Sequence, residues 1–575
     1  MSASEPVSPE PTGEGSILAS LTPEQRAAAI ALTGPVVIRA GAGTGKTRTI
    51  THRIAYGIRS GVYDPGSILA LTFTTRAAGE LRLRLRALGA GTVTARTFHA
   101  AALSQLSYFW PHAIGGQRPT VLPGKGDAIA QAAERIRIRT TPQAVRELAS
   151  EIEWRKVTER SIADYASVAA NERPTPTGLS LEQTVDVMQA YEDTKDERRQ
   201  LDFEDVLLAT VGMLEMEPWV TQRVREQYRF FVVDEFQDVS PLQEHLLRTW
   251  MGDRRDLCVV GDPAQTIYSF TGATSRYLNG FSHTFPEARA FELTGSFRST
   301  PAILHEANDL SRSIPNALTL VPGGDRVSVF RPDIRDEADD ATEAKSIAAA
   351  VRRDLDEGVP PGEIAVLTRV LSQQSSVRQA LEQSGIPIAP AGGKRFFNDP
   401  NVRLAMAQIH AQALVPDESR PLFQTVSDAL RAVGWTQSPP AEGPLRDRWQ
   451  ALDALIHLAE SRPAGVGIRE FDAELRERAA AGLEPDLQAV VVTTLHAAKG
   501  LEWESVHIPG LHEGLMPISH ATTDDEVLEE RRLLYVGITR AKTRLRLSWA
   551  RSATPGGPER SPSRFLAELG TRSGH

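Results

Sequence analysis

The chain has 575 residues, of which 41% are hydrophobic and 24% are charged, and its formal net charge is −9. A single hydrophobic core stops growing at about 250–300 residues, so we expect about three to five domains. The charge argues neither for nor against a nucleic-acid partner, but any DNA contact would need a local basic groove in an acidic body. The single cysteine, Cys258, excludes an intramolecular disulfide and a cysteine-cluster zinc site. We find no signal peptide and no apolar run of about 18 residues, and therefore expect a cytoplasmic protein without membrane contacts.

The first part of the chain, residues 1–20, is rich in Ser, Pro, Glu and Gly, and this composition predicts a disordered leader. From Val36 the pattern is an apolar strand, a glycine-rich turn and a helix that begins near Gly45. A second strand over residues 68–73 and a helix over residues 76–88 follow. Strands that alternate with helices predict a parallel sheet with helices on its faces.

Residues 101–200 are mainly helical in pattern, and apolar strand patterns then return at residues 230–233 and 257–261. This order predicts one α/β domain, formed by residues 21–100 and 201–288, that is interrupted by a helical insertion. Cys258 lies within the second of these apolar runs and is expected to be a small buried hydrophobic side chain.

A second α/β pattern starts near Arg289 and is interrupted by helical sequence at residues 398–485. It predicts a second α/β domain formed by residues 289–397 and 486–568, followed by a short tail at residues 569–575. The fold class is therefore predicted to be α/β, with two parallel-sheet domains that each carry a mainly helical insertion. The strands expected in the second domain are residues 326–330, 364–367, 489–493, 506–508 and 544–549.

A glycine-rich segment at residues 40–47 lies between the first predicted strand and its helix. Glycines let a backbone fold around phosphates with its N–H groups pointing inward, and the helix N-terminus adds partial positive charge. Lys46 is expected to reach the β- and γ-phosphates of ATP, and the Thr47 hydroxyl to hold Mg²⁺. Ala40 stands where such loops usually have their first glycine. The remaining nucleotide-binding residues expected in this loop are Gly41, Ala42, Gly43, Thr44 and Gly45.

The predicted strand at residues 230–233 ends in two carboxylates, Asp234 and Glu235. Parallel α/β sheets place their ligands at the carboxyl ends of strands, so we assign Asp234 to Mg²⁺ and Glu235 to the attacking water. On its own this pattern would also fit an acidic turn after a buried strand. A phosphate loop with carboxylates fits transporters, GTPases and small-molecule kinases as well, so further motifs must decide the class.

An ordered set of motifs between Leu21 and Leu566 resembles the UvrD/Rep/PcrA helicases, a branch of the superfamily 1 DNA helicases. Each motif alone is weak or moderate evidence, but eight in the family's order leave little room for chance. The resemblance implies two RecA-like domains with ATP bound between them, helical insertions, and 3′→5′ translocation on single-stranded DNA. The motifs are LTPEQ at 21–25, LTFTTRAA at 71–78, TFHA at 97–100, DEFQD at 234–238, GDPAQTIYSF at 261–270, SFRST at 296–300, TLHAAKGLE at 494–502 and ERRLLYVGITRA at 530–541.

The resemblance also implies roles at the nucleotide. Arg298 and Arg540 would contact the phosphates with their planar, bidentate guanidinium groups, and Gln265 would sense the γ-phosphate. Surface ion pairs are the ordinary alternative for both arginines. The remaining contacts implied are Gln25 to the adenine, Arg48 near the adenine and Glu502 to the ribose.

For DNA, the resemblance implies that Tyr268 and Phe270 stack on bases. Base–aromatic stacking does not depend on the sequence, which suits a motor that steps over every base. Phe73 and Phe203 are further candidates for stacking, with burial in a core as the alternative reading. His99 and His496 are expected to touch the DNA backbone.

The sequence departs from the family pattern at four places. Thr271 stands where an arginine commonly follows the stacking aromatic, and Phe297 replaces a tyrosine before the arginine of the motif at 296–300. The loop at residues 551–558, which follows the motif at 530–541, has no aromatic residue to serve as a strand-separating pin, and the second insertion is short. ATP hydrolysis and translocation are therefore firmer predictions than strong unwinding. We expect no nuclease or zinc-binding domain after Leu566.

The leading hypothesis is an ATP-dependent DNA helicase and translocase that acts on single-stranded DNA and single-strand/duplex junctions in repair, recombination or replication, with repair or replication proteins as possible partners. The second hypothesis is a translocase that strips proteins from single strands and unwinds weakly. A P-loop ATPase that acts on something other than nucleic acid is the third, and absence of DNA-stimulated ATP hydrolysis would favour it. A non-catalytic DNA-binding relic is the fourth, and the intact Lys46, Glu235 and Arg540 argue against it.

Overall fold

The computed structural model describes residues 17–389, 396–416, 420–438, 440, 444–463, 465–485 and 488–570. Its contacts divide the chain into two compact units, and the main boundary falls between Leu293 and Thr294. Two short segments that precede this boundary, Gly41–Gly45 and Thr75–Glu80, group with the second unit.

The first unit is built on one parallel sheet with the strand order β3-β2-β6-β7-β1-β8. Its inner strands are almost fully apolar and buried, as expected for a sheet that is covered on both faces. The predicted parallel α/β class is therefore confirmed for this part of the chain. The strands are β1 (Val36–Ala40), β2 (Ile68–Thr72), β3 (Thr94–Thr97), β6 (Phe230–Val233), β7 (Leu257–Gly261) and β8 (Arg289–Leu293).

Two sets of helices cover this sheet, and alternate residues of β1 show the division. Val36 and Ile38 pack into the core formed with α2 (Pro23–Ile30), α3 (Lys46–Arg59) and α4 (Thr75–Ala87). Val37 packs into the opposite core, formed with α5, α10 and α12. The helices of this second face are α5 (Phe98–Ala113), α10 (Phe203–Met216), α11 (Pro218–Gln227) and α12 (Pro241–Met251). Cys258 is buried in the first of these cores, as predicted.

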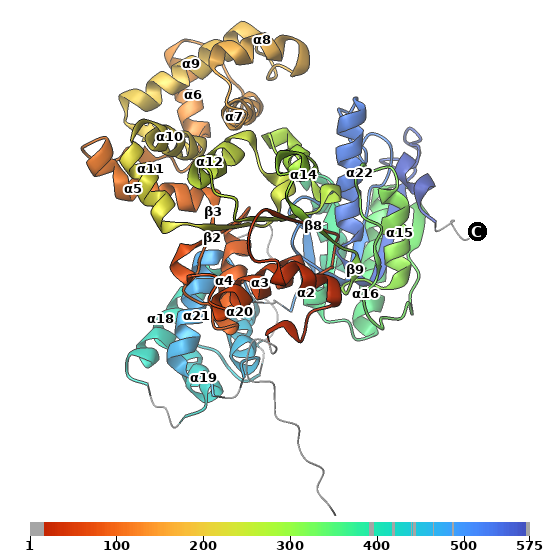
Figure 1. Cartoon of the computed structure of the whole chain (residues 1–575). Helices are drawn as coiled ribbons and strands as arrows, with labels where there is room; N and C mark the ends of the chain where they lie inside the picture. The colour runs from red at the N-terminus through yellow and green to blue at the C-terminus, as the bar shows by residue number, and fades with distance from the viewer. Residues whose placement is uncertain are drawn as a thin grey trace, which may run out of the picture. The chain divides into compact units, whose positions relative to one another are not determined.

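A helical bundle interrupts the first unit, and Figure 1 shows it in orange and yellow. Its helices share a hydrophobic core of their own that includes Leu148, Tyr165 and Tyr191. The pair β4 (Thr120–Val121) and β5 (Gln200–Leu201) joins the chain where it enters and leaves the bundle. The helices are α6 (Gly126–Arg135), α7 (Pro142–Val157), α8 (Ile162–Glu172) and α9 (Leu181–Glu197).

The second unit contains another parallel sheet, with the order β11-β15-β14-β12-β13. Its strands are β11 (Asp333–Glu337), β12 (Ile364–Thr368), β13 (Val491–Thr494), β14 (Trp503–Ile508) and β15 (Ala541–Ala550). The helices that follow or precede these strands are α15 (Pro301–Ser311), α16 (Asp340–Asp356), α17 (Gln374–Gln383) and α22 (Asp524–Ile538).

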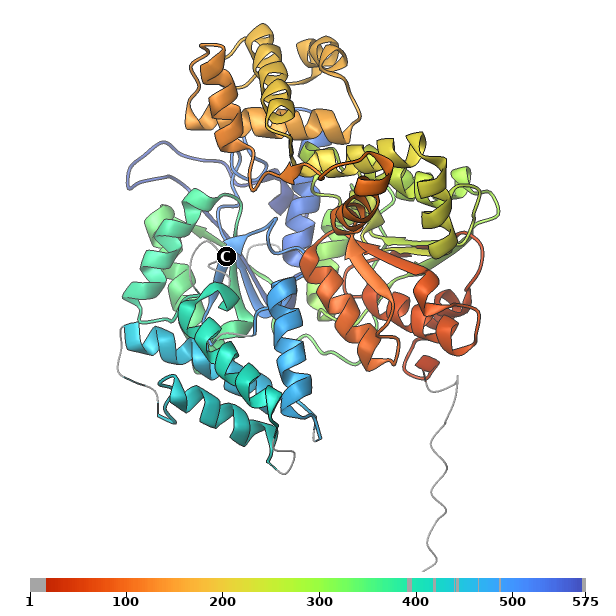
Figure 2. The same cartoon turned by 90° about the vertical axis from the view of Figure 1, so that its left-hand side faces the viewer.

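A second helical bundle interrupts this unit and is coloured cyan to blue in Figure 2. It has its own core, in which Phe471 and Trp435 are buried. Its helices are α18 (Pro400–Leu414), α19 (Leu422–Ala432), α20 (Pro444–Glu460) and α21 (Ile468–Ala481).

The structure differs from the sequence prediction at the edges of the domains. Ile17 is buried in the core of the first unit and the Ser20 carbonyl accepts a hydrogen bond from Arg48, so the predicted leader ends before these residues, while residues 1–16 lie outside the described part. β8, predicted to begin the second α/β domain, instead pairs with β1 in the first sheet. α5, predicted to belong to the insertion, packs on the first sheet through Ala102 and Leu106.

Residues 326–330 were predicted to form a strand, and this prediction is wrong. Val327 and Val329 are 75% and 78% exposed, and the Phe330 ring lies 3.9 Å from the Arg544 guanidinium carbon. The place beside β15 is taken by the more polar β11 instead. Alternating apolar residues are the sequence signal of a strand, but a strand also needs a neighbouring edge to pair with.

Among the residues described, we find no helix long and apolar enough to cross a membrane.

Candidate active site

The candidate active site lies at the carboxyl edge of the first sheet. β6, β7 and β1 are adjacent and parallel, so their carboxyl ends share one edge. The glycine-rich loop leaves β1, the predicted carboxylates leave β6, and the motif that contains Gln265 leaves β7. Three segments far apart in sequence are thus brought to one edge, where α/β proteins bind their ligands.

The glycine-rich loop has the conformation that the sequence predicts. Gly43 and Gly45 have φ angles of 73° and 82°, a region that residues with a side chain rarely adopt. The buried Thr44 hydroxyl donates to the Gly41 carbonyl at 2.9 Å, and the Lys46 ammonium donates to the Ala40 carbonyl at 3.3 Å. α3 begins at Lys46, so a cation and a helix N-terminus adjoin the same turn.

The two predicted carboxylates differ in their surroundings. Asp234 is buried, its N–H donates to Leu71 of β2, and its Oδ1 accepts the N–H of Glu235 at 3.0 Å. Glu235 is half-buried and has a left-handed backbone with a φ of 53°. A residue other than glycine in this region is uncommon, and such positions cluster at functional sites.

Gln265 is buried and its side-chain amide donates to Asp262 Oδ2 at 2.7 Å. Asp262 Oδ1 accepts the N–H of Ala264 at 3.0 Å, which fixes the short turn that carries Gln265. The amide of Gln237 in turn links this turn to Glu235, a connection that the motif pattern did not reveal.

The predicted adenine contacts lie at the start of the first unit. Gln25 is buried and closes a capping box at the start of α2, where its Oε1 accepts the Thr22 N–H at 3.2 Å. The Arg48 guanidinium donates to the Ser20 carbonyl at 2.9 Å. Both side chains therefore also have local structural partners.

In the second unit, Arg298, Glu502 and Arg540 form one cluster. Arg298 Nε donates to Glu502 Oε2 at 2.6 Å, and its Nη1 donates to the Thr539 carbonyl. Burial would raise the pKa of Glu502, but the charge and hydrogen bond of Arg298, followed by Lys542 and Arg540, outweigh it and hold this pKa below its usual value. Glu502 was predicted to bind the ribose; here its carboxylate pairs with an arginine.

Arg540 is almost fully buried. Its guanidinium donates to the carbonyls of Val536 and Leu501 and to the Thr539 hydroxyl, at 3.0 to 3.2 Å. The surface ion pair considered as an alternative therefore does not describe this residue. For Arg298, which is paired with Glu502, that alternative stays open.

Four of the side chains predicted to contact DNA form two stacked pairs in the first unit. The rings of Phe73 and Tyr268 are 5.3 Å apart at 17°, and Phe270 follows with its ring 6.2 Å from Tyr268. His99 and Phe203 stack at 3.8 Å and 11°. Phe203 and Phe270 are 56% and 50% exposed, which argues against burial in a core.

Phe203 is held in place by a buried ionic cluster at the start of α10. Lys156 Nζ lies 2.8 Å from Asp202 Oδ2 and 2.6 Å from Asp205 Oδ1, and Lys195 contacts both carboxylates. Burial would lower the pKa of Lys156, but Asp202, Asp205 and Glu192 outweigh it and raise this pKa. Removing one partner of such a cluster leaves a buried charge uncompensated.

The two histidines predicted to touch the DNA backbone are uncharged near neutral pH. Burial, with a smaller contribution from Lys125, lowers the pKa of His99 to about 4. Burial, with Arg369 and Lys499, lowers the pKa of His496 to about 4 as well. A neutral ring supplies no positive charge to a phosphate, and His99 instead stacks on Phe203.

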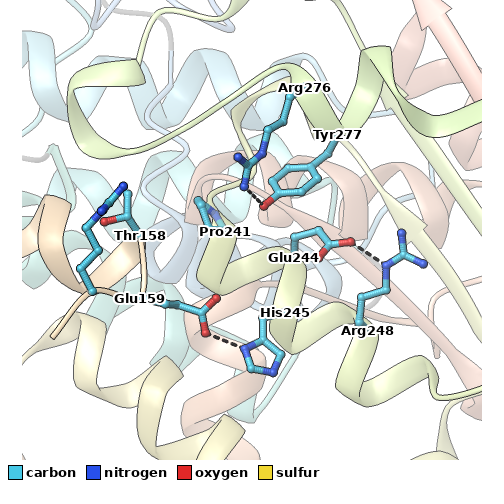
Figure 3. A pocket seen from close by; sticks show the side chains of 9 residues that line it. Thr158, Glu159, Pro241, Glu244, His245, Arg248, Arg276 and Tyr277 are labelled. Carbon is cyan, nitrogen blue, oxygen red and sulfur yellow. Dashed lines mark hydrogen bonds and ion pairs between the residues drawn. The ribbon is translucent and has the colours of Figure 1, made fainter. Parts of the chain in front are cut away.

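A hollow of about 480 Å³ in the first unit contains none of the predicted residues (Figure 3). His245 points at Glu159, with 2.5 Å between Nδ1 and Oε1, and its Nε2 lies 2.9 Å from Glu215. Burial would lower the pKa of His245, but the two carboxylates outweigh it and raise this pKa. Arg248 likewise pairs with Glu244. Because these charged groups pair with each other, we assign the hollow no ligand.

Phe270→Ala is expected to weaken single-strand binding and to slow translocation, because stacking contributes about 1–3 kcal/mol per base. The affinity for oligo-dT, measured by fluorescence anisotropy, and the translocation rate check this expectation. Phe423→Ala is the control, because this exposed phenylalanine lies on α19 of the second bundle. Unchanged affinity and speed in Phe270→Ala would rule out a stacking role.

Comparison with known proteins agrees with the motif order. The UvrD/REP helicase N-terminal domain model matches residues 21–286, and the UvrD-like helicase C-terminal domain model matches residues 291–437 and 455–552. The chain is 44% identical to the ATP-dependent DNA helicase UvrD2 of Mycobacterium tuberculosis (strain ATCC 25618 / H37Rv) over 580 residues, covering 96% of this chain and 81% of that protein.

More distant relatives cover the chain equally well. DNA helicase II of Escherichia coli (strain K12) is 28% identical over 96% of this chain and 88% of its own length. The ATP-dependent DNA helicase PcrA of Bacillus subtilis (strain 168) is 27% identical over 96% and 86%. With both family models matched in order along its two α/β units, the chain belongs to the UvrD/Rep/PcrA-type DNA helicases.

Proposed function

We propose that this chain is a DNA-dependent ATPase that moves 3′→5′ along single-stranded DNA and opens single-strand/duplex junctions during repair, recombination or replication. The observation that carries the proposal is that one short segment after β7 contains both a nucleotide-site residue and a stacked aromatic residue. This segment holds Gln265 at the nucleotide edge of the sheet and Tyr268 in the stacked pair with Phe73. A change at the nucleotide can therefore reach the rings that would hold a base.

In this proposal the glycine-rich loop and Lys46 bind the phosphates of ATP, and Glu235 orients and deprotonates the attacking water. Asp234 and Thr47 would hold Mg²⁺. Their carboxylate and hydroxyl oxygens are the hard donors that this ion prefers. Asp234 follows β6 and Thr47 lies in the first turn of the helix after β1, and only β7 separates these two strands in the sheet. When bound, the metal would neutralise charge on the β- and γ-phosphates.

Further residues complete the proposed nucleotide contacts. Gln265 senses the γ-phosphate, Gln25 reads the adenine, and Arg48 packs near the adenine. Glu502 would exchange its Arg298 partner for the ribose. Arg298 and Arg540 supply cations that stabilise charge developing in the transition state. We further propose a cytoplasmic protein, with repair or replication proteins as possible partners.

A second candidate is a translocase that strips proteins from single strands and unwinds weakly. The loop at residues 551–558 is closed by a hydrogen bond from the Arg560 N–H to the Arg551 carbonyl at 2.7 Å, and it presents no aromatic side chain. Thr271, which replaces the usual arginine, donates its hydroxyl to the Tyr268 carbonyl at 2.9 Å and brings no cation to this segment.

A comparison of tailed duplexes tests the proposal and separates the two candidates. We expect ATP turnover to rise strongly with single-stranded DNA, and strand separation on 3′-tailed but not on 5′-tailed duplexes. ATP turnover on single strands without separation of either duplex would select the stripping translocase. Separation of the 5′-tailed duplex alone would overturn the polarity, and turnover indifferent to DNA would overturn the function.

A further inference from the structure

Gln237 lies between the two candidate catalytic segments of the site, those that carry Glu235 and Gln265. It lies in the short helix η2 (Phe236–Asp238) after β6 and has no exposed surface. Its Nε2 donates to Glu235 Oε2 at 2.5 Å and to Asp238 Oδ2 at 3.2 Å. Its Oε1 accepts the N–H of Asp262 at 3.0 Å. The side-chain amide therefore bridges the segments that leave β6 and β7.

This bridge needs a group that donates and accepts at once. Two carboxylates require donors on one side, and a backbone N–H requires an acceptor on the other. A primary amide offers both, whereas a carboxylate cannot donate and an ammonium or guanidinium cannot accept. Gly261 of the neighbouring strand β7 leaves room for the amide because it has no side chain. A Cβ at this position would lie only 2.6 Å from Gln237 Oε1.

The bridge continues to the predicted γ-phosphate sensor. Asp262, held by Gln237 through its N–H, accepts the Gln265 amide at its Oδ2 and caps the turn with its Oδ1. A continuous chain of hydrogen bonds thus runs from the Glu235 carboxylate through Gln237 and Asp262 to Gln265. Buried polar networks of this kind fix side-chain geometry when every member is satisfied.

We propose that Gln237 is a positioning residue that aims the Glu235 carboxylate and ties it to the segment that carries Gln265. The inference rests on the proposed ATPase function, since it concerns the same site. Gln237 acts through Glu235 and Asp262 and does not itself touch the nucleotide. Its loss leaves the carboxylate free to turn away from the attacking water, and misplacement of a reacting group by about 1 Å can cost on the order of 10²-fold in rate.

The chain offers a matched control in Gln105. This glutamine is also buried in the first unit, where its Oε1 accepts the Trp250 indole N–H at 2.8 Å. It lies on α5, outside the segments that leave β6 and β7. Replacing either glutamine by methionine keeps the volume similar and removes a buried hydrogen bond, so a purely structural role predicts the same outcome for both.

We expect Gln237→Met to lower the DNA-stimulated kcat by about 10- to 100-fold, with the KM for ATP and the Kd of a non-hydrolysable ATP analogue little changed. Gln237→Glu should be impaired at least as much, because it keeps the acceptor for Asp262 but gives Glu235 no donor. Gln105→Met should lower the melting temperature and leave kcat unchanged. Gly261→Ala keeps Gln237 but crowds its Oε1, so it should reproduce the kinetic effect if Gln237→Met does not fold.

A near-normal kcat in folded Gln237→Met and Gly261→Ala would overturn the inference, and so would equal losses of kcat in Gln237→Met and Gln105→Met. ATP turnover of the unaltered chain, measured with and without DNA, distinguishes failure of this inference from failure of the proposed function. If its turnover is not stimulated by DNA, the proposed function fails. If its turnover is stimulated by DNA and Gln237→Met retains a near-normal kcat, only the positioning role of Gln237 fails.

Discussion

Glu235→Gln is expected to reduce ATP turnover by about 10²- to 10⁴-fold, the usual contribution of a general base, while ATP and single-stranded DNA still bind. The substitution keeps the size of the side chain and an oxygen that can accept the Gln237 amide, so the local geometry persists. What is lost is the ability to take a proton from water. Asp234 and the Lys46 loop are untouched, so nucleotide binding should remain.

Steady-state turnover with oligo-dT, together with equilibrium binding of ATP under conditions without hydrolysis, checks this expectation. Glu226→Gln is the matched control, since Glu226 is an exposed glutamate that pairs with Arg223 and accepts from Gln222 on the same helix, α11. Turnover in Glu235→Gln close to that of the unaltered chain would contradict the assignment. Loss of ATP binding together with turnover would point to a role in holding the nucleotide instead.

The strands that carry the site could be predicted from sequence because each is an apolar run followed at once by chemically distinctive residues. β1 leads into the glycine-rich loop and β6 into Asp234, so one pattern marks both the strand and its functional end. β8, which the sequence prediction misplaced, lacks such a marker. It mixes polar with apolar residues and is exposed at three of its five positions, and its membership of the first sheet depends on pairing with β1, a tertiary contact that periodicity does not encode.

Residue types at the site could be predicted, but their partners could not. The motif pattern marks Glu502 and Arg298 separately, and only the structure shows that they pair. It marks His99 as a backbone contact, whereas burial against Phe203 leaves the ring neutral. Gln237 stands within the DEFQD motif at 234–238, yet its bridge to Asp262 depends on β6 and β7 being neighbours, which the sequence order of the strands does not reveal.

Arg540→Lys is expected to lower the DNA-stimulated kcat by about 10³- to 10⁵-fold, the contribution of an arginine that stabilises phosphoryl-transfer charge. Lysine keeps the positive charge but lacks the planar fork that bonds two phosphate oxygens at once. Arg540 also donates to the carbonyls of Val536 and Leu501, so the substitution should lower the melting temperature as well. The Kd of a non-hydrolysable ATP analogue should change far less than kcat.

If Arg540 had a purely structural role, its substitution would lower stability without a specific loss of kcat. Arg544→Lys is the control that distinguishes the two cases. Arg544 is likewise buried in the second unit, where its guanidinium lies 2.6 Å from Asp354 Oδ1. Its replacement should cost stability through the loss of a buried ion pair and leave kcat unchanged below the melting transition. If Arg540→Lys and Arg544→Lys lose turnover only in proportion to their loss of folded protein, Arg540 does not act on the phosphates. A large fall in kcat confined to folded Arg540→Lys, at constant nucleotide affinity, is the result that the proposed mechanism requires.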